Sequence, residues 1–126
     1  MKDTKAEVVL ADTYALVEII RGNENYKMYT EKVLVTTMLN LMEFYYQMLR
    51  ESGEAAAEKV FNLYIKRMIP ISITAIKQGM MFKLKYKKEN LSYTDCVGYA
   101  LAKELEIPFL TGDIKFEHKE YVRYVK

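Results

Sequence analysis

Short apolar runs alternate along the chain with longer segments in which apolar residues recur every three or four positions. The short runs are rich in Val, Ile, Leu and Phe, which is typical of strands buried on both faces of a sheet. They predict strands at residues 7–11, 33–35, 68–71, 107–111 and 121–125. The run at 68–71 contains Pro70, which cannot donate a hydrogen bond to a neighbouring strand, so we expect it at a sheet edge or a strand end.

The longer segments have the spacing of amphipathic helices, with polar or glycine positions at their ends. They predict helices at residues 13–21, 36–52, 54–66, 73–86 and 92–105, and a short helix or loop at 23–32. Strands that alternate with helices in this way favour a parallel sheet covered on both faces. The pattern therefore predicts a three-layer α/β domain.

Size and composition limit the kind of protein. The chain has 126 residues without a linker, repeat or low-complexity segment, so we expect one domain over residues 1–126. Hydrophobic residues make up 51% and charged residues 29%, values that are typical of a globular protein and not of a disordered one. The net charge of +2 gives no overall basic field, so contact with a nucleic acid has to come from a local patch.

The sequence also indicates the compartment. No apolar run approaches the roughly 20 residues that span a bilayer, and the first residues lack the pattern of a secretory signal, so we expect no membrane association. The single Cys96 cannot form an internal disulfide. A reducing, cytoplasmic location fits both observations.

Four acids stand in otherwise apolar stretches. Each is the only charge of its stretch: Asp12 in VVLADTYALV, Glu43 in TTMLNLMEFYYQML, Asp95 in NLSYTDCVGYALA and Asp113 in IPFLTGDI. Asp12 and Asp113 follow predicted strands, whose carboxyl ends meet at one edge of a parallel sheet. Four carboxylates in one crevice need a cation to remain ionised together. Because oxygen ligands suit hard ions, Mg²⁺ or Mn²⁺ fits better than zinc.

Each acid also has an ordinary structural explanation. Asp12 can cap the helix that follows it, Asp95 completes a capping box with Ser92, and Asp113 suits the turn after its strand. Glu43 is the hardest to explain in this way, because no base lies three or four residues from it. A distant Lys as its partner is the alternative to a cation.

The ordered set of acids resembles the PIN domain family of small α/β metal-dependent nucleases, in particular VapC-type toxins and their archaeal relatives. ADTYALVEIIRGN resembles the first motif, an Asp followed by Ser or Thr and an apolar helix. VTTMLNLMEFYYQML resembles the second motif, a lone Glu within an apolar helix. LSYTDCVGYALAKELEIPFLTGDIKF resembles the third and fourth, an Asp that opens a helix and a strand that leads to T-G-D. The resemblance covers residues 7–125, although Tyr14 stands where a small residue is commoner.

The resemblance implies a PIN-like fold, with a parallel sheet of four to five short strands flanked by helices. It implies catalytic acids that hold one or two Mg²⁺ or Mn²⁺ ions, at Asp12, Glu43, Asp95 and Asp113. Thr13 and Thr111 match hydroxyl positions that hydrogen-bond to the ligand carboxylates or to a metal-bound water. Whether Glu43 binds the ion or orients the attacking water stays open.

The implied function is an endoribonuclease that hydrolyses RNA phosphodiester bonds, as the toxin of a type II toxin–antitoxin pair. Its partners would be RNA, a small antitoxin protein and a second copy in a homodimer. The apolar faces around Tyr45, Tyr46 and Phe61 are candidates for those protein contacts, or else plain core. One alternative is a PIN nuclease of RNA processing or decay without a toxin role. The other is a non-catalytic module that binds metal or RNA.

One dense basic segment, KLKYKKEN, is a candidate RNA-binding surface. It carries four lysines around one tyrosine, namely Lys83, Lys85, Tyr86, Lys87 and Lys88. Lysines that contact phosphates beside an aromatic ring that stacks on a base are typical of single-strand binding. The alternative is a solvated helix end, where the helix dipole favours Lys.

Overall fold

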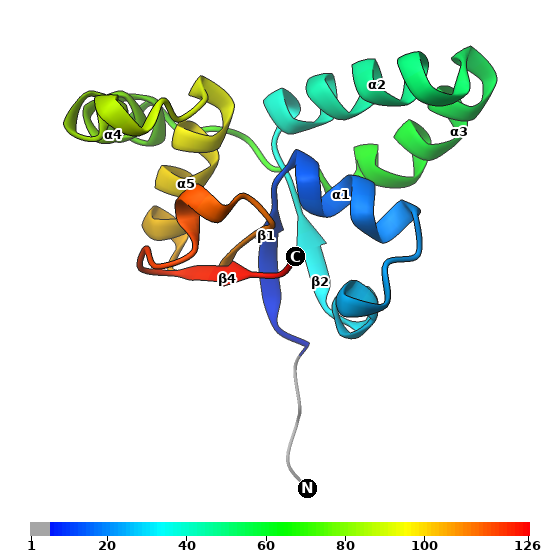
Figure 1. Cartoon of the computed structure of the whole chain (residues 1–126), viewed down its shortest axis with the longest axis horizontal. Coiled ribbons are helices and arrows are strands. Elements are labelled where there is room, and N and C mark those ends of the chain that lie inside the picture. Colours follow the sequence, from blue (N-terminus) through cyan, green and yellow to red (C-terminus); the bar gives the residue numbers. More distant parts are fainter. Residues whose placement is uncertain (1–5) are drawn as a thin grey trace, which may run out of the picture.

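The computed structural model describes residues 6–126, in which five α-helices surround a four-stranded sheet (Figure 1). The strands are β1 (Val8–Ala11), β2 (Val33–Val35), β3 (Phe109–Thr111) and β4 (Val122–Tyr124). The helices are α1 (Thr13–Ile20), α2 (Met38–Ser52), α3 (Glu54–Tyr64), α4 (Ile73–Lys85) and α5 (Tyr93–Leu105). Short 3₁₀ helices are η1 (Glu24–Glu31), η2 (Ile65–Arg67), η3 (Lys87–Glu89) and η4 (Ile114–Phe116). Residues 1–5, on which the single-domain and signal-peptide predictions partly rest, lie outside the described residues.

The sheet is parallel throughout, with the strand order β2-β1-β3-β4. Leu10 of β1 pairs with Val35 of β2 on one side and with Phe109 of β3 on the other. The predicted α/β fold with a parallel sheet is confirmed. All strands point the same way, so their carboxyl ends form a single edge.

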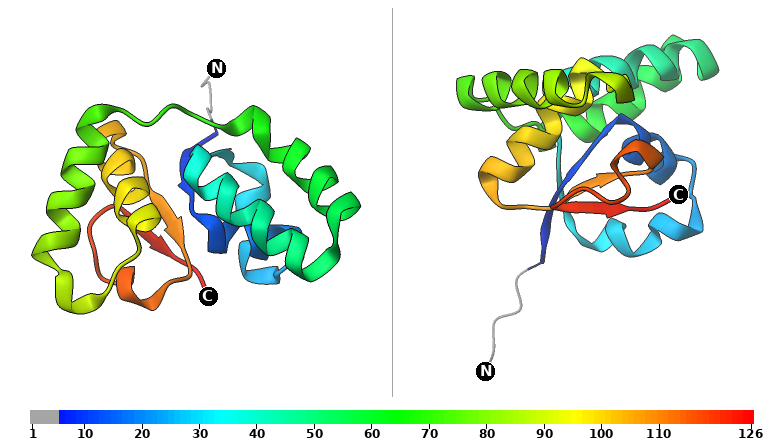
Figure 2. Two further views of the ribbon diagram at one scale, coloured as in Figure 1. Left: turned by 90° about the horizontal axis from the view of Figure 1, so that it is seen from above. Right: turned by 60° about the vertical axis from the view of Figure 1, so that its left-hand side comes forward.

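Helices cover both faces of the sheet and build a core on each. Val9 and Ala11 of β1 belong to the core that α1, α2 and α3 cover, whereas Leu10 belongs to the core beneath α4 and α5. This alternation follows from the two-residue period of a strand. Seen from above, the pair α2 and α3 and the pair α4 and α5 lie on opposite sides of the strands (Figure 2).

Two predicted segments differ in the structure. The strand predicted at residues 68–71 is wrong: Met68 forms only an isolated bridge to Thr36, and the chain then runs to α4. Ile69 donates its N–H to the carbonyl of Thr36 at 2.8 Å, but Pro70 has no N–H with which to extend a ladder. The polar segment 23–32 forms η1, the short helix of the two structures expected there.

Some of the aromatic side chains that were candidates for protein contacts pack within the α2–α3 hairpin. Gly53, at a φ of 85°, ends α2 and begins α3. The rings of Tyr45 and Phe61 meet edge to face at 5.3 Å between centroids, so they belong largely to the hairpin itself. Tyr46 stays 63% exposed. No helix within residues 6–126 is long and apolar enough to cross a membrane.

Candidate acidic active site

The four isolated acids meet at the carboxyl edge of the sheet. They line one open cavity of about 410 Å³, together with Thr13, Tyr14, Gly112, Ile114 and Lys126. Asp12 directly follows β1, Asp113 comes two residues after β3, Glu43 projects from α2, and Asp95 lies in the first turn of α5. Segments that are far apart in the sequence thus supply one acidic cavity.

Asp12 caps α1 and still contributes a carboxylate to the cavity. Its Oδ1 accepts a hydrogen bond from the backbone N–H of Ala15 at 2.8 Å, and the residue is only 2% exposed. Burial, and then the nearby charge of Asp95, raise the pKa of Asp12 from 3.8 to about 8. A hydrogen bond with the Thr111 hydroxyl opposes this rise. The capping explanation is therefore correct, but capping leaves the Asp12 carboxyl buried beside another acid.

Glu43 is held by a hydroxyl group. The Thr13 hydroxyl donates to Oε1 of Glu43 at 2.9 Å, and its oxygen also lies 3.2 Å from the carbonyl oxygen of Asn40. No ion pair formed within residues 6–126 includes Glu43 or any of the other three acids. The alternative of a distant Lys partner for Glu43 is thus not found in the described part of the chain.

Asn40 is a buried residue of this site that sequence reasoning missed. It is 0% exposed, accepts a hydrogen bond from the Thr37 hydroxyl at 2.7 Å, and donates one to Oγ1 of Thr13 at 3.3 Å. It thereby fixes the residue that holds Glu43. The available signal was a second polar side chain in the apolar helix, one turn before Glu43.

Asp95 lies in the first turn of α5, behind the cap residue Ser92. The Ser92 hydroxyl oxygen accepts the backbone N–H of Asp95 at 3.0 Å, which forms half of the predicted capping box. Burial, and then the charges of Asp113 and Glu43, raise the pKa of Asp95 from 3.8 to about 6. The Ser92 hydroxyl and the Lys115 ammonium act in the opposite direction.

Thr111 links the two acids that follow the central strands. Its Oγ1 accepts the backbone N–H of Asp113 at 3.0 Å, and its hydroxyl also hydrogen-bonds to the carboxyl of Asp12. Oδ1 of Asp113 accepts the N–H of Lys115 at 2.9 Å and caps η4. The ends of β1 and β3 are therefore tied together beside the cavity.

The ligand atoms that the cavity offers are of the type that a hard divalent cation prefers. Every acidic group of the cavity offers oxygen, and among the described residues no Cys or His lines it. Burial and mutual repulsion, which raise the pKa of Asp12 and Asp95, are the conditions that a bound cation relieves. Within residues 6–126, however, no three or more His, Cys, Asp or Glu side chains are grouped closely enough to hold an ion as they stand. The acids share a cavity without being drawn together.

Tyr14, the residue that departs from the expected small side chain, rests on Gly112. A Cβ atom placed on Gly112 would lie 2.0 Å from Cε1 of Tyr14, so only glycine fits beneath this ring. Tyr14 is 36% exposed and lines the cavity beside Asp12. The absence of a side chain at Gly112 therefore makes room for the bulky ring of Tyr14.

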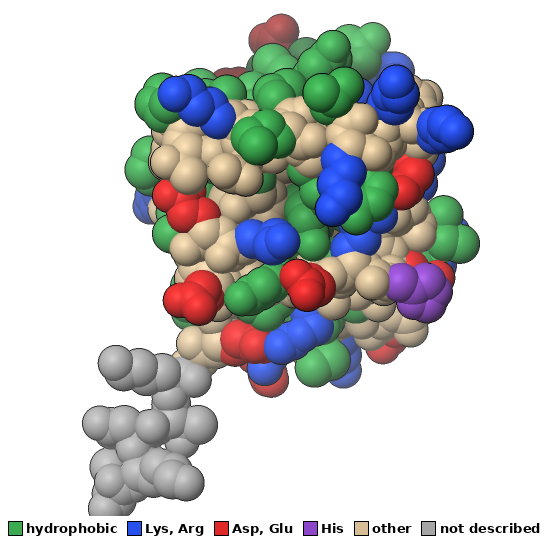
Figure 3. All heavy atoms as spheres, turned by 90° about the vertical axis from the view of Figure 1, so that its left-hand side faces the viewer, with side chains coloured by type: hydrophobic (Ala, Val, Ile, Leu, Met, Phe, Trp, Pro, Cys, Tyr) green, Lys and Arg blue, Asp and Glu red, His purple; other side chains and the backbone are tan. Residues whose placement is uncertain are grey.

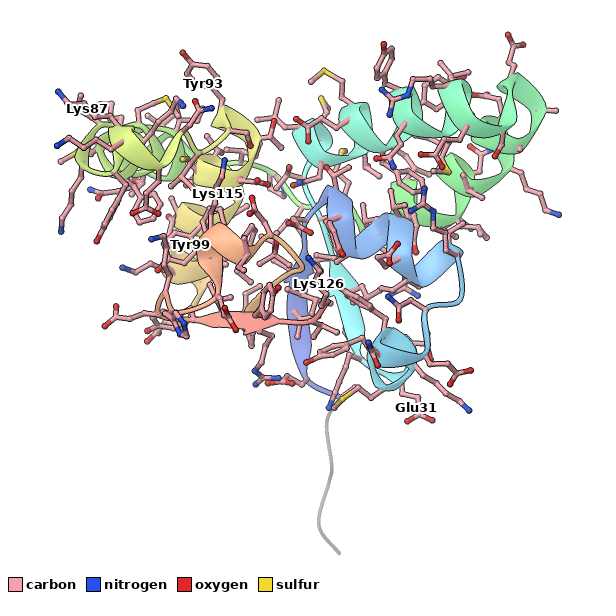
Figure 4. All side chains as sticks on the ribbon, viewed as in Figure 1. Glu31, Lys87, Tyr93, Tyr99, Lys115 and Lys126 are labelled. Carbon is pink, nitrogen blue, oxygen red and sulfur yellow. The ribbon has the colours of Figure 1, made fainter. Side chains whose placement is uncertain are left out.

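The predicted basic segment lies apart from the acidic cavity, at the end of α4 and in η3. Lys83 donates a hydrogen bond to the carbonyl of Leu91, and its Nζ lies 4.6 Å from the ring centroid of Tyr93. Lys85 lies 5.4 Å from the ring of Tyr86. Lys87 is on the α4 side of the molecule, away from Lys126 (Figure 4). None of the five residues of the segment lines the acidic cavity.

Comparison with known proteins identifies similar folds. The model of the PIN domain family matches residues 9–120. A toxin–antitoxin complex from Klebsiella pneumoniae superimposes with a TM-score of 0.72 at 18% identity, covering 91% of this chain and 95% of that one. VapC20 of Mycobacterium tuberculosis, a toxin that cleaves the sarcin-ricin loop, gives 0.75 at 15% identity, with 94% and 99% covered. PAE2754 from Pyrobaculum aerophilum gives 0.67 at 15% identity, with 96% and 92% covered. No curated protein sequence matches significantly.

Proposed function

Because the chain belongs to the PIN domain family, whose members are generally nucleases that use divalent metal ions, we propose that it is a Mg²⁺- or Mn²⁺-dependent endoribonuclease. The observation that carries this proposal is the cavity shared by Asp12, Glu43, Asp95 and Asp113. Phosphodiester hydrolysis needs positive charge beside the phosphate and an activated water. A set of acids that forms no ion pair within residues 6–126 suits the binding of such charge.

In this proposal, Asp12, Asp95 and Asp113 hold one or two ions. A divalent cation bound there supplies charge that offsets the phosphate and lowers the pKa of a water molecule. Glu43 either holds the ion or orients the attacking water, and its hydrogen bond to Thr13 fixes its direction for both roles. Thr111 holds the carboxyl of Asp12 in place.

The raised pKa values of Asp12 and Asp95 support the same site. Without a cation, burial and neighbouring acids disfavour their ionised forms. A cation reverses this balance, and its binding would draw the carboxylates toward one another. The separation of the acids in the structure thus predicts a local contraction when metal is added.

We also propose that the protein is the cytoplasmic toxin of a type II toxin–antitoxin pair, acting as a homodimer that a small antitoxin neutralises. The support is the fold shared with the Klebsiella toxin–antitoxin complex and with VapC20. A PIN nuclease of RNA processing would have the same acidic site but no such partner. Arrest of growth on expression, relieved by a small protein encoded beside it, distinguishes the two.

Incubation with structured RNAs, with and without Mn²⁺, tests the nuclease. Wild type is expected to produce discrete fragments only with metal, and Asp95→Asn is expected to cut at least about a hundredfold more slowly. Glu31→Gln is the matched control, since Glu31 is exposed and lies at the far end of the molecule (Figure 4). No metal-dependent product from wild type contradicts the nuclease. Full activity of Asp95→Asn contradicts the site.

A further inference from the structure

A second concave surface lies beside the acidic cavity, on the face formed by α4, α5 and η4. It consists of two cavities of about 570 Å³ each, larger than the acidic one. They share four lining residues, Phe82, Lys85, Tyr99 and Lys103. We call this continuous surface the α4–α5 groove and define it by those four residues together with Tyr86 and Lys119.

The groove is basic where it approaches η4. This part is lined by four lysines and the single His118, against one acid, Glu120. Lys103 reaches Glu120 only at 3.7 Å and Lys119 pairs with Glu89 at 3.1 Å, so a positive excess remains. Blue side chains surround apolar atoms in the middle of this face, with the purple histidine at one side (Figure 3).

Aromatic rings form the floor between the lysines. The centroid of the Phe82 ring lies 4.8 Å from those of Tyr86 and Tyr99. Nζ of Lys119 is 4.4 Å from the Tyr86 centroid, and Nζ of Lys103 is 5.7 Å from that of Tyr99. Ammonium groups beside aromatic faces are the arrangement by which proteins bind the phosphates and bases of single-stranded nucleic acid.

The groove and the acidic cavity are neighbours across η4. Ile114 lines both of them, and the next residue, Lys115, lines the groove. Lys115 also donates a hydrogen bond to the carbonyl of Asn90 at 3.2 Å, which ties η4 to the loop before α5. Lys115 and Tyr99 lie on the same side of the molecule (Figure 4). The groove and the acidic cavity therefore adjoin at Ile114.

We propose that the α4–α5 groove binds the single-stranded RNA that leads away from the cleavage site, with Lys85, Lys103 and Lys119 on its phosphates and a base on the aromatic floor at Tyr86. The inference rests on the proposed function, since it takes the acidic cavity as the place of the scissile phosphate. Unpaired RNA is the fitting occupant because aromatic side chains stack only on bases that are free of a duplex.

This groove sharpens the RNA-binding prediction made from the segment KLKYKKEN. Of that segment, only Lys85 and Tyr86 line the groove. Tyr99, Lys103 and Lys119 come from later parts of the chain and complete it. The inferred surface is thus a product of the packing of α4 against α5 and η4, not of one basic run.

Binding of a labelled 12-nucleotide oligouridylate, measured by fluorescence anisotropy in EDTA so that nothing is cut, tests the groove. The double variant Lys85→Ala/Lys103→Ala is expected to bind about tenfold more weakly. The salt slope of its binding should fall by about 1.4, at roughly 0.7 for each phosphate contact on a single strand. The control Lys59→Ala/Lys66→Ala removes the same charge from exposed positions on α3 and η2, and its binding should match wild type. Equal losses in both double variants, or no binding by wild type, overturn the proposal.

Tyr86→Leu separates base stacking from attraction of charge. It should weaken binding of the oligouridylate several-fold and leave binding of inorganic polyphosphate unchanged. Equal effects on both ligands overturn the stacking role. If thermal unfolding shows that Tyr86→Leu does not fold, the double variant of the exposed lysines tests the groove in its place. The role of base binding is then tested on wild type, which is expected to bind the oligouridylate more tightly than polyphosphate. Equal affinity for both ligands then contradicts a base-binding groove.

Cleavage of RNA by wild type in Mn²⁺, assayed in parallel, keeps the two proposals apart. Cleavage together with unchanged binding by the lysine double variant overturns the groove and leaves the proposed function intact. Lysine-dependent binding without cleavage contradicts the proposed function and supports the groove as a site for single-stranded RNA.

Discussion

The hydroxyl of Thr13 donates a hydrogen bond to Oε1 of Glu43 across 2.9 Å, and so joins the first turn of α1 to the middle of α2. Asn40, fully buried one turn before Glu43, holds the oxygen of the same hydroxyl. Glu43, in the apolar first half of α2, therefore has a fixed direction, toward the cavity that it shares with three other acids.

Replacement of Thr13 by Val keeps the shape of the side chain and removes its hydrogen bonds. We expect cleavage to slow by about 10- to 100-fold, the usual effect of losing a group that orients a metal ligand. Thr13→Ser keeps the hydroxyl and should restore most of the rate. Single-turnover rates of RNA cleavage measure this, with thermal unfolding as the check on folding. Equal rates for Thr13→Val and wild type would show that the contact does not orient Glu43 for catalysis.

Gly112→Ala places a methyl group against the ring of Tyr14. Because the contact would be 2.0 Å, we expect a loss of about 1–3 kcal/mol in the free energy of unfolding, measured by urea denaturation. In a Tyr14→Ala background the same substitution should cost much less, since the ring is gone. An equal cost in both backgrounds would contradict the packing of Tyr14 on Gly112.

The buried carboxyl of Asp12 predicts how the metal-free protein responds to pH. The folded state keeps this group protonated up to about pH 8, whereas its ordinary pKa is 3.8. The unfolded state thus binds fewer protons between these values, and the free energy of unfolding falls as the pH rises through this window. The pKa of Asp95 is about 6, so this group adds to the fall in the free energy of unfolding only in the lower part of the pH window.

Asp12→Asn tests that dependence, because the amide oxygen retains the hydrogen bond from Ala15 without the charge. At pH 8 in EDTA we expect this variant to be more stable than wild type by over about 1.4 kcal/mol, the equivalent of one pKa unit. Its stability should change little between pH 6 and 8. Urea unfolding at several pH values measures both, and a wild-type profile that is flat from pH 4 to 8 would be inconsistent with a protonated Asp12.

The apolar pattern predicted most of the fold because the central strands β1 and β3 are largely buried and the helices end at strong local signals. Thr37 and Ser92 cap their helices through hydrogen bonds to Asn40 and Asp95, and Gly53 takes the positive φ between α2 and α3. The strand predicted at 68–71 failed because its apolar residues pack only partly buried against the two cores, and Pro70 has no N–H to extend the pairing beyond Ile69.

The site was predicted only in part, for a physical reason. Isolated charges in apolar stretches are visible in the sequence, so the four acids that line one cavity could be named from it. The role of Asn40 depends on which hydroxyl packs against it, and the α4–α5 groove depends on how two helices meet. Tyr99 stands at a position along α5 that is typical of a core residue. Only 3% of its surface is exposed, although it lines that groove. Such roles arise from packing between distant segments.

Titration with Mn²⁺, followed by electron paramagnetic resonance of the free ion, tests most directly that the acids share a cation. We predict that Asp12→Asn, Asp95→Asn and Asp113→Asn each weaken binding by about tenfold or more, since a lost ligand costs at least as much as a lost orienting group. Glu31→Gln, the exposed control, should bind as wild type does. Unchanged affinity in the three Asp variants, or an equal loss in the control, would contradict a metal site formed by these acids.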